Sequence, residues 1–477
     1  MAKNIITDKA LEEKTLHTTE TTPPTPHRDK LLVSRGSIVA NILSTLLLRI
    51  AGRCSFVLLG FYLGEHFASA SIVAVVIESY YITELLFAPI IGGLSDRKGR
   101  KPFLLFAPVL GALATGFLLL ASMLFPHPNG DQFNWQIVIL LLMVLAGRLL
   151  EGLSTGFNAP ASLGYITDAT VGSEKLRARV VTAFEVATVF GLAMAIPLGG
   201  TISKWIGTWG FLVVMAMHGL NFLLIMFFMG ESVKPSENSE GSHGSLLSSF
   251  QVITEKRIFT FLPAWLTVNA LVGALTNLTT IVLAYPNPAA DQRFPHQLLY
   301  GGFHKDTATY IVGGFGAFFL IGMGLWVIVL PRMRRSTAMF IGLAGLAIVI
   351  VCLWLVNGLA ENPTEISNSV KPELYTLLPL IVAGIVMLSG FTPAALTQMG
   401  AISETLPGKR GAVMGLYSVA LGVGQFVGIF VGGIAVDMGG FYGLMIFSAI
   451  LGLISFFSVL YMRSHNHDML KTGAHSA

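Results

Sequence analysis

Charged residues and cysteines are both scarce in this sequence. Only 12% of the 477 residues are Asp, Glu, Lys or Arg, whereas 53% are hydrophobic and the mean hydropathy is +0.70. A water-exposed surface needs roughly a quarter of its residues charged, so this composition excludes a soluble globular chain and a disordered one. The two cysteines each lie in a long apolar run, which argues against a disulfide framework and against a metal site.

Several chemical motifs are also missing. The sequence has no Gly-rich phosphate loop ending in Lys-Ser or Lys-Thr, so ATP is not implied. No Ser-His-Asp, paired-His or metal-ligand spacing rises above background, so we do not expect an enzyme or a bound cofactor. The net charge of +4 comes from short basic clusters between apolar runs and not from one patch, which argues against a nucleic-acid partner.

The sequence has instead twelve apolar stretches, each close to the roughly 20 residues that a helix needs to cross a bilayer. They predict an all-α membrane protein with twelve transmembrane helices in two six-helix bundles. The predicted spans of the first bundle are 37–63, 71–93, 103–125, 136–167, 180–203 and 209–230. Those of the second bundle are 258–284, 309–330, 337–357, 375–400, 411–436 and 440–462.

The polar segments around these spans predict the domain organisation. They divide the chain into a disordered cytoplasmic tail (1–36), an N-terminal bundle (37–230), a cytoplasmic linker (231–257), a C-terminal bundle (258–462) and a second cytoplasmic tail (463–477). The loops and tails on the side of the termini hold 23 Lys and Arg residues, against four on the opposite side. Positive loops stay in the cytoplasm, so we expect both termini there and the chain in a cell inner or plasma membrane.

The two halves are predicted to be copies of one another, offset by 233 residues. At this offset Pro160 corresponds to Pro393 and Arg177 to Arg410, and glycines at 191, 199 and 200 match glycines at 424, 432 and 433. One register over some forty residues indicates a repeat, because Gly, Pro and Arg are not apolar filler. Duplicated halves with a substrate path at their interface are a recurring transporter architecture.

One loop carries a specific motif. Residues 92–102, GGLSDRKGRKP, lie between the second and third spans and resemble the signature loop of the major facilitator superfamily. RLLEG at 148–152 with Gly156, and YITD ending at Asp168, resemble that family's fourth span. The fifth span, GLAMAIPLGG at 191–200, partly resembles the Gly-Pro motif of the proton-coupled drug antiporters, but Ala195 and Ile196 stand where Gly directly precedes Pro.

The resemblance implies a conformational latch on the cytoplasmic side. In the family, an acid and a base of this loop hold one of two alternating-access states, which implies that Asp96 lies near the start of span eleven and Arg97 near Asp168. A topology signal alone would need no acid at position 96. The residues that we assign to the latch are Gly93, Asp96, Arg97, Gly99, Arg100 and Asp168.

The charges inside the predicted spans all fall in the first half. An ionisable group in the bilayer costs several kcal/mol, so each is expected to face the bundle interior or a water-filled cavity. Counting from the cytoplasmic ends puts Arg53, Glu78, Arg148 and Glu151 at similar depth, so they are our main candidates for proton coupling. Burial favours the neutral form of a carboxyl group and a nearby arginine favours its charged form, which lets conformation control proton binding.

Three further charges, Arg49, Glu84 and Glu185, lie nearer the cytoplasm and are weaker coupling candidates. For all seven groups, ion pairs that only hold the bundle together are the competing interpretation. The second half offers neutral polar groups, which we assign either to the substrate cavity or to contacts between helices. The cavity candidates are Asn269, Asn277, Gln398, Tyr417 and Gln425.

These observations predict a secondary active transporter that works by alternating access as a functional monomer, with a small-molecule substrate and a proton gradient as its energy source. The signature loop and the partial Gly-Pro motif favour proton-coupled efflux of small amphiphilic compounds. Proton-linked uptake of a nutrient or an organic anion is the alternative, because three arginines lie within the spans. A non-transporting membrane receptor is a remote alternative, since the linker and tails are short for a signalling surface.

Overall fold

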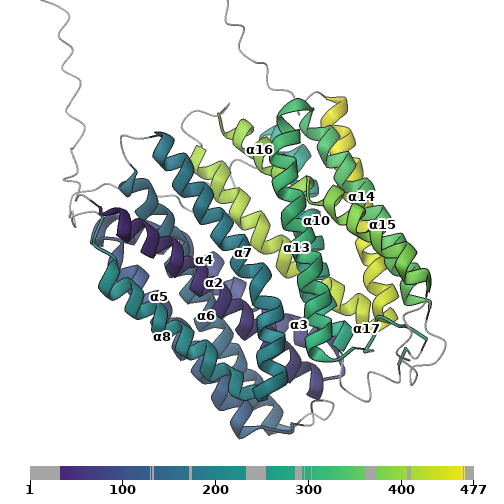
Figure 1. The fold of residues 1–477 in the computed structure, drawn as a ribbon, viewed down its shortest axis with the longest axis horizontal. Helices are drawn as coiled ribbons and strands as arrows, with labels where there is room; N and C mark the ends of the chain where they lie inside the picture. The colour runs from purple at the N-terminus through teal and green to yellow at the C-terminus, as the bar shows by residue number, and fades with distance from the viewer. Residues whose placement is uncertain are drawn as a thin grey trace, which may run out of the picture.

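The chain folds into helices that lie in two groups, as the computed structural model in Figure 1 shows. It describes residues 33–128, 130, 134–170, 174–232, 254–284, 293–294, 296–301, 303–359, 372–404, 410–465 and 467. Within these ranges there is no β-strand, which confirms the predicted all-α class. The predicted tails and linker fall largely in residues 1–32, 233–253 and 468–477, outside the described residues, so these boundaries remain predictions.

The first half consists of α2 to α8, coloured purple to teal in Figure 1. Its elements are α2 (Arg35–His66), α3 (Ala70–Glu78), α4 (Tyr80–Lys98), α5 (Lys101–Leu124), α6 (Trp135–Ala169), α7 (Glu174–Ile206), η1 (Gly207–Trp209) and α8 (Gly210–Phe228). The second half, green to yellow, comprises α10 (Lys256–Gly273), η3 (Ala274–Leu278), α11 (Thr279–Ala284), α13 (Lys305–Val329), η4 (Leu330–Arg332), α14 (Arg335–Asn357), α15 (Pro372–Leu388), α16 (Phe391–Glu404) and α17 (Arg410–Ser464).

Ten segments of the described chain are long and apolar enough to cross a membrane. Two of them are double length: Val186–Phe228 has 43 residues and Val419–Ser464 has 46. The first contains the turn η1, and the second contains Gly440, whose φ of 60° lies in the left-handed region that glycine tolerates. Each double segment therefore has room for two crossings, which is consistent with twelve.

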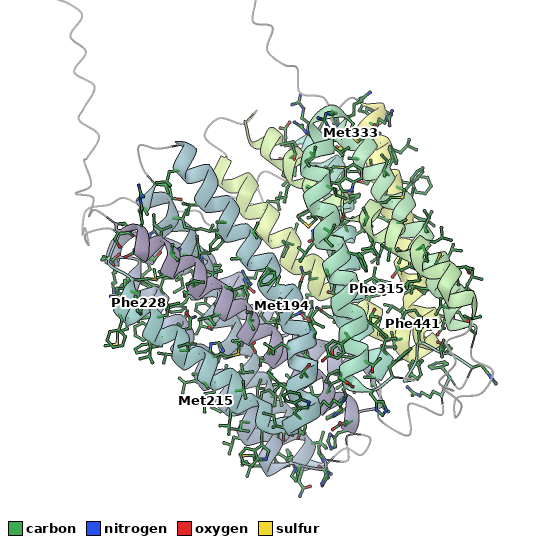
Figure 2. The ribbon with its side chains drawn as sticks, in the orientation of Figure 1. Met194, Met215, Phe228, Phe315, Met333 and Phe441 are labelled. Atoms are coloured by element: carbon green, nitrogen blue, oxygen red, sulfur yellow. The ribbon has the colours of Figure 1, made fainter. Side chains whose placement is uncertain are left out.

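We name the two ends of the molecule by the helix ends that lie there. The tail face is where α2 begins at Arg35 and α17 ends at Ser464, on the upper side of Figure 1. The far face is where α2 ends at His66 and α3 begins at Ala70. The outer surfaces of both groups carry exposed apolar side chains, such as Phe228 of the first half (Figure 2) and Phe457 of the second. Exposed apolar side chains of this kind suit contact with lipid.

Two predicted spans are interrupted where continuous helices were expected. Ser79 separates α3 from α4 directly after Glu78, and the π-helical turn η3 separates α10 from α11 around Asn277. A π-turn shifts the hydrogen-bond ladder by one residue and often accompanies a functional site. Apolar sequence carries no local signal for either break, but both position the polar residues described next.

Candidate functional site

The interruption at Ser79 gives an arginine of the neighbouring helix a backbone partner. Nε of Arg148 donates a hydrogen bond to the carbonyl oxygen of Ile77 at 2.6 Å. The approach is close because Gly152, one turn further along α6, lies against the backbone of Tyr80 and leaves no room for a larger side chain. The Arg148 guanidinium also lies 4.8 Å from the centre of the Tyr80 ring, a cation–π contact.

Arg148 and Glu151 form a buried ion pair on one face of α6. Nη1 of Arg148 donates to Oε2 of Glu151, and the Ser55 hydroxyl donates to the same carboxylate oxygen at 3.4 Å. The Arg148 side chain is 2% exposed and that of Glu151 is 9% exposed. Removing one partner of such a pair leaves a buried charge uncompensated, at a cost of about 3–5 kcal/mol. This pair therefore has a structural role whatever else it does.

Glu78 is connected to the second half through an amide. Nδ2 of Asn277 donates to Oε1 of Glu78 at 2.9 Å, and Nη2 of Arg53 donates to Oδ1 of the same Asn277. Oε2 of Glu78 is buried and has no hydrogen-bond partner among the described residues. Asn277 thus bridges a base and an acid of the first half from the second half. The second carboxylate oxygen remains available to bind a proton.

A cavity of about 60 Å³ lies beside this cluster. Its wall carries the charged groups of Arg49, Arg53, Arg148 and Glu151, and the Tyr80 ring. This space suits a few water molecules, whereas a drug-sized ligand needs roughly 300–1,000 Å³. All of the described residues that line it belong to the first half.

The structure thus brings together the four main coupling candidates, Arg53, Glu78, Arg148 and Glu151. Of the weaker ones, Arg49 lines the cavity and its Nε has no partner among the described residues. Glu84 is half-buried and lies where Gly156 of α6 packs against its backbone. The side chain of Glu185 is outside the described residues.

The neutral candidates of the second half separate into two groups. Asn277 joins the charged cluster, and Oε1 of Gln425 accepts a hydrogen bond from the Tyr81 hydroxyl across the interface between the halves. Asn269 instead donates to the Trp265 carbonyl of its own helix at 2.8 Å. Gln398 contacts the Arg335 side chain and the backbone of His467, near the tail face. The side chain of Tyr417 is not among those described.

The signature loop is held at the tail face by Arg100. Nε of Arg100 lies 3.1 Å from Oδ2 of Asp168, and its Nη1 donates to the Ser95 hydroxyl at 2.8 Å. Gly99 has a φ of 97°, and Glu231 accepts from the backbone nitrogens of Arg100 and Lys101. Arg100 therefore pairs with Asp168, the residue near which the resemblance places Arg97. The side chains of Asp96 and Arg97 are outside the described residues, and Gly93 has open space beside it.

The far face carries contacts between the halves that sequence reasoning missed. Asp437 of α17 accepts hydrogen bonds from the backbone nitrogens of Ala70 and Ser71 at 2.6 and 3.1 Å, and from the hydroxyls of Ser69 and Ser71 at 2.8 and 2.6 Å. This carboxylate caps the N-terminus of α3, where a negative charge is favoured. Gly433 of α17 allows the approach because it lies against the Ser71 backbone.

Two ion pairs accompany this cap at the far face. Nζ of Lys204 lies 2.6 Å from Oδ2 of Asp306, and Lys305 pairs with Glu65. All four residues stand at or just outside predicted span ends, and the two lysines are among the four basic residues on the side opposite the termini. Among the described residues, the hydrogen bonds between the halves lie at mid-depth or at this face.

Comparison with known proteins identifies the family. The family model of the Major Facilitator Superfamily matches residues 42–298 and 294–476. The chain belongs to the major facilitator superfamily. It is a multi-pass membrane protein of a transporter family, as the signature loop implied. This membership agrees with the two groups of helices that meet at the polar contacts described above.

Two curated proteins are similar to parts of this chain. "Tetracycline resistance protein, class C" of Escherichia coli is 32% identical over 170 residues, which cover 35% of this chain and 37% of that protein. "Inner membrane transport protein YajR" of Escherichia coli strain K12 is 23% identical over 372 residues, 77% of this chain and 68% of that protein. The match to the tetracycline protein therefore spans little more than a third of its length.

A solved structure supports the fold. A bacterial homologue of the iron transporter ferroportin, in an inward-facing state, superposes with a TM-score of 0.65 at 13% identity, covering 90% of this chain and 98% of the other. At this identity the likeness extends to the fold alone. It supports the major facilitator arrangement of two six-helix bundles.

Proposed function

We propose that this superfamily member is a proton-coupled exporter of small amphiphilic compounds that works by alternating access. The family membership supports transport, and the partial match to tetracycline-resistance proteins supports efflux. We further propose that both termini face the cytoplasm, since 23 of the Lys and Arg residues outside the spans lie on that side.

One observation carries the coupling proposal: the hydrogen-bonded chain from Arg53 through Asn277 to Glu78 joins the two halves. When the halves move relative to each other, Asn277 leaves with the second half, and the carboxyl group of Glu78 exchanges its partners. A change of partners alters the free energy of proton binding at this group. Proton uptake and release thereby become tied to the state of the transporter.

The arginines support a second candidate function, uptake or export of an organic anion. Arg49, Arg53 and Arg148 face the cavity, and Glu151 is the only acid among the described residues that line it. These three arginines already outnumber Glu78 and Glu151, and protonation of Glu78 increases the excess of positive charge. An anionic substrate is the chemistry that such an excess attracts.

Reconstitution into liposomes tests both candidates. The purified protein is placed in vesicles with an imposed pH gradient, and amphiphilic cations, sugars and organic anions are screened for movement. Exchange of an amphiphilic compound against protons is expected. Accumulation of the compound in the same direction as the protons would rule out the exporter and favour uptake.

A further inference from the structure

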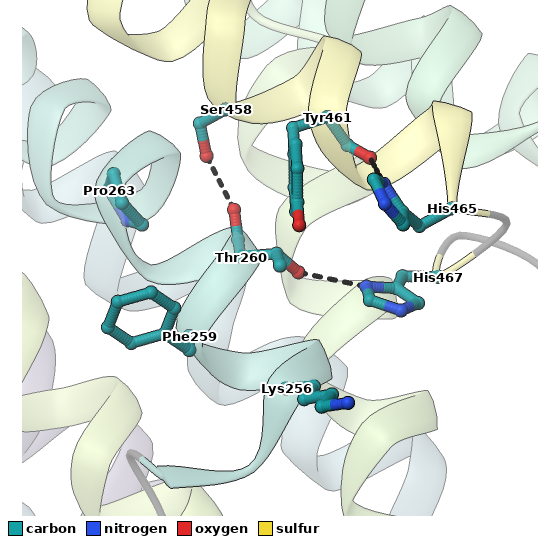
Figure 3. Close-up of a pocket in the computed structure, with 8 residues that line it drawn as sticks. All are labelled: Lys256, Phe259, Thr260, Pro263, Ser458, Tyr461, His465 and His467. Atoms are coloured by element: carbon teal, nitrogen blue, oxygen red, sulfur yellow. Dashed lines mark hydrogen bonds between the residues drawn. The ribbon is translucent and has the colours of Figure 1, made fainter.

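A groove of about 570 Å³ opens at the tail face, far from the charged cluster. It lies between the first turns of α10 and the last turns of α17, and Figure 3 shows its lining residues. Lys256 and His465 lie at the tail-face end, and Pro263 lies about 10 Å deeper along α10, given the rise of a helix. The groove therefore runs from the membrane surface toward the apolar layer.

The walls of the groove are apolar and open to the side of the molecule. The Phe259 side chain is 65% exposed and that of Tyr461 is 52% exposed. Phe457, one turn below Tyr461 on the same helix, is 63% exposed. In a protein that spans a membrane, such aromatic side chains near a helix end meet the boundary between headgroups and acyl chains. The neighbour of this groove is therefore lipid.

The polar groups of the groove include a lysine and a tyrosine that line it. At its floor, the Ser458 hydroxyl donates to the Thr260 carbonyl at 2.7 Å, and Thr260 Oγ1 lies 3.1 Å from Nδ1 of His467 (Figure 3). The ammonium group of Lys256 and the hydroxyl of Tyr461 have no hydrogen-bond partner among the described residues. No acidic side chain is among the described residues that line the groove. The ammonium group of Lys256 and the hydroxyl of Tyr461 are therefore available to a ligand in the apolar groove.

We propose that this groove binds the headgroup of an anionic phospholipid from the leaflet at the tail face. The phosphate accepts from Lys256 and Tyr461, and an acyl chain follows the apolar side of α10 past Phe259 and Pro263. Anionic lipids are concentrated in the cytoplasmic leaflet, the side to which the positive loops assign the tail face. The proposal does not depend on the transported substrate or on proton coupling.

Lipid binding to the purified full-length protein tests the proposal. The protein is delipidated in detergent and titrated with phosphatidylglycerol or phosphatidylcholine of identical acyl chains, and bound lipid is counted by native mass spectrometry. Phosphatidylglycerol is expected to bind at least five-fold more tightly. Lys256→Ala should weaken its binding about five-fold, the effect expected of one cation near an anionic headgroup. Lys256→Arg, which keeps the charge, should retain it.

Arg332→Ala is the matched control, because Arg332 is an exposed cation near the same face that does not line the groove. It should bind phosphatidylglycerol as the parent protein does, and Tyr461→Phe should weaken binding by removing one donor. Equal affinities for the two lipids, or equal losses in Lys256→Ala and Arg332→Ala, would overturn the proposal. So would displacement of the lipid by millimolar inorganic phosphate, because the groove would then be a site for a soluble anion.

Discussion

Replacing the two buried acids of the charged cluster separates proton coupling from structural pairing. Glu78→Gln removes a negative charge but keeps the volume and the oxygen that accepts from Asn277. Its new amide nitrogen falls where Oε2 has no partner, and an unsatisfied buried donor costs about 1–3 kcal/mol. Glu78 makes no direct ion pair with a described residue, and Arg53 and Arg148 interact with its charge only at longer range, so its neutralisation costs less than breaking the Arg148–Glu151 pair. We expect a folded protein that has lost coupling.

Glu151→Gln is the matched comparison. Glu151 pairs directly with Arg148, so its neutralisation leaves a guanidinium that is 2% exposed without a counter-charge. The expected cost is about 3–5 kcal/mol, a large share of the 5–15 kcal/mol that stabilises a typical domain. We expect this variant to be the less stable of the two, with lower thermal stability and lower yield.

The assay combines thermal stability in detergent with two flux measurements in liposomes. One follows transport driven by an imposed pH gradient, and the other follows substrate exchange without a gradient. Glu78→Gln should abolish the first and retain the second. A Glu78→Gln protein that is stable and still moves protons with the substrate would refute the assignment of Glu78. Loss of both fluxes together with unfolding would show that the buried amide of Glu78→Gln costs more than about 1–3 kcal/mol.

Three other predictions concern the two faces and the interface between the halves. Asp437→Ala removes the cap of α3 and should shift the population toward states open at the far face by about 5–30-fold, equivalent to about 1–2 kcal/mol. Spin-label distances across that face measure the shift, and an unchanged distance distribution contradicts the prediction. Asp96→Asn should leave insertion intact but alter the distances across the tail face and slow turnover, so normal transport with unchanged distances would remove Asp96 from the latch. Gln425→Ala removes the contact with Tyr81 and should change substrate affinity without changing its pH dependence, which binding titrations at two pH values test.

The sequence alone predicts the class of fold because hydropathy is additive along a span. Twenty apolar residues in a row suffice to indicate a membrane helix, and the basic loops orient it. Depth counting also grouped Arg53, Glu78, Arg148 and Glu151, since groups at one depth in adjacent helices meet when those helices pack. These are consequences of spacing, which a sequence records directly.

The details of pairing depend on backbone geometry that spacing does not record. The carbonyl of Ile77 receives Arg148 only because the helix is interrupted at Ser79, and the place of Asn277 depends on the π-turn. At the tail face, the left-handed Gly99 reverses the chain, and Arg100 then reaches Asp168. The predicted latch included Arg100 without a partner, and its contact with Asp168 follows from this turn.

The predicted internal repeat could nevertheless have indicated the far-face contacts. The offset of 233 residues places Asp437 at the position of Lys204, so the two residues end equivalent helices, and each contacts the opposite half of the protein. Their chemistry has diverged. The Lys204 side chain is 57% exposed and pairs with another charge, a contact that salt screens, whereas Asp437 is held by backbone amides and hydroxyls. Raising the ionic strength should therefore weaken the contact of Lys204 with Asp306 and spare the contact of Asp437 with α3. The two halves thus contribute chemically different contacts to the far face at positions that the predicted repeat makes equivalent.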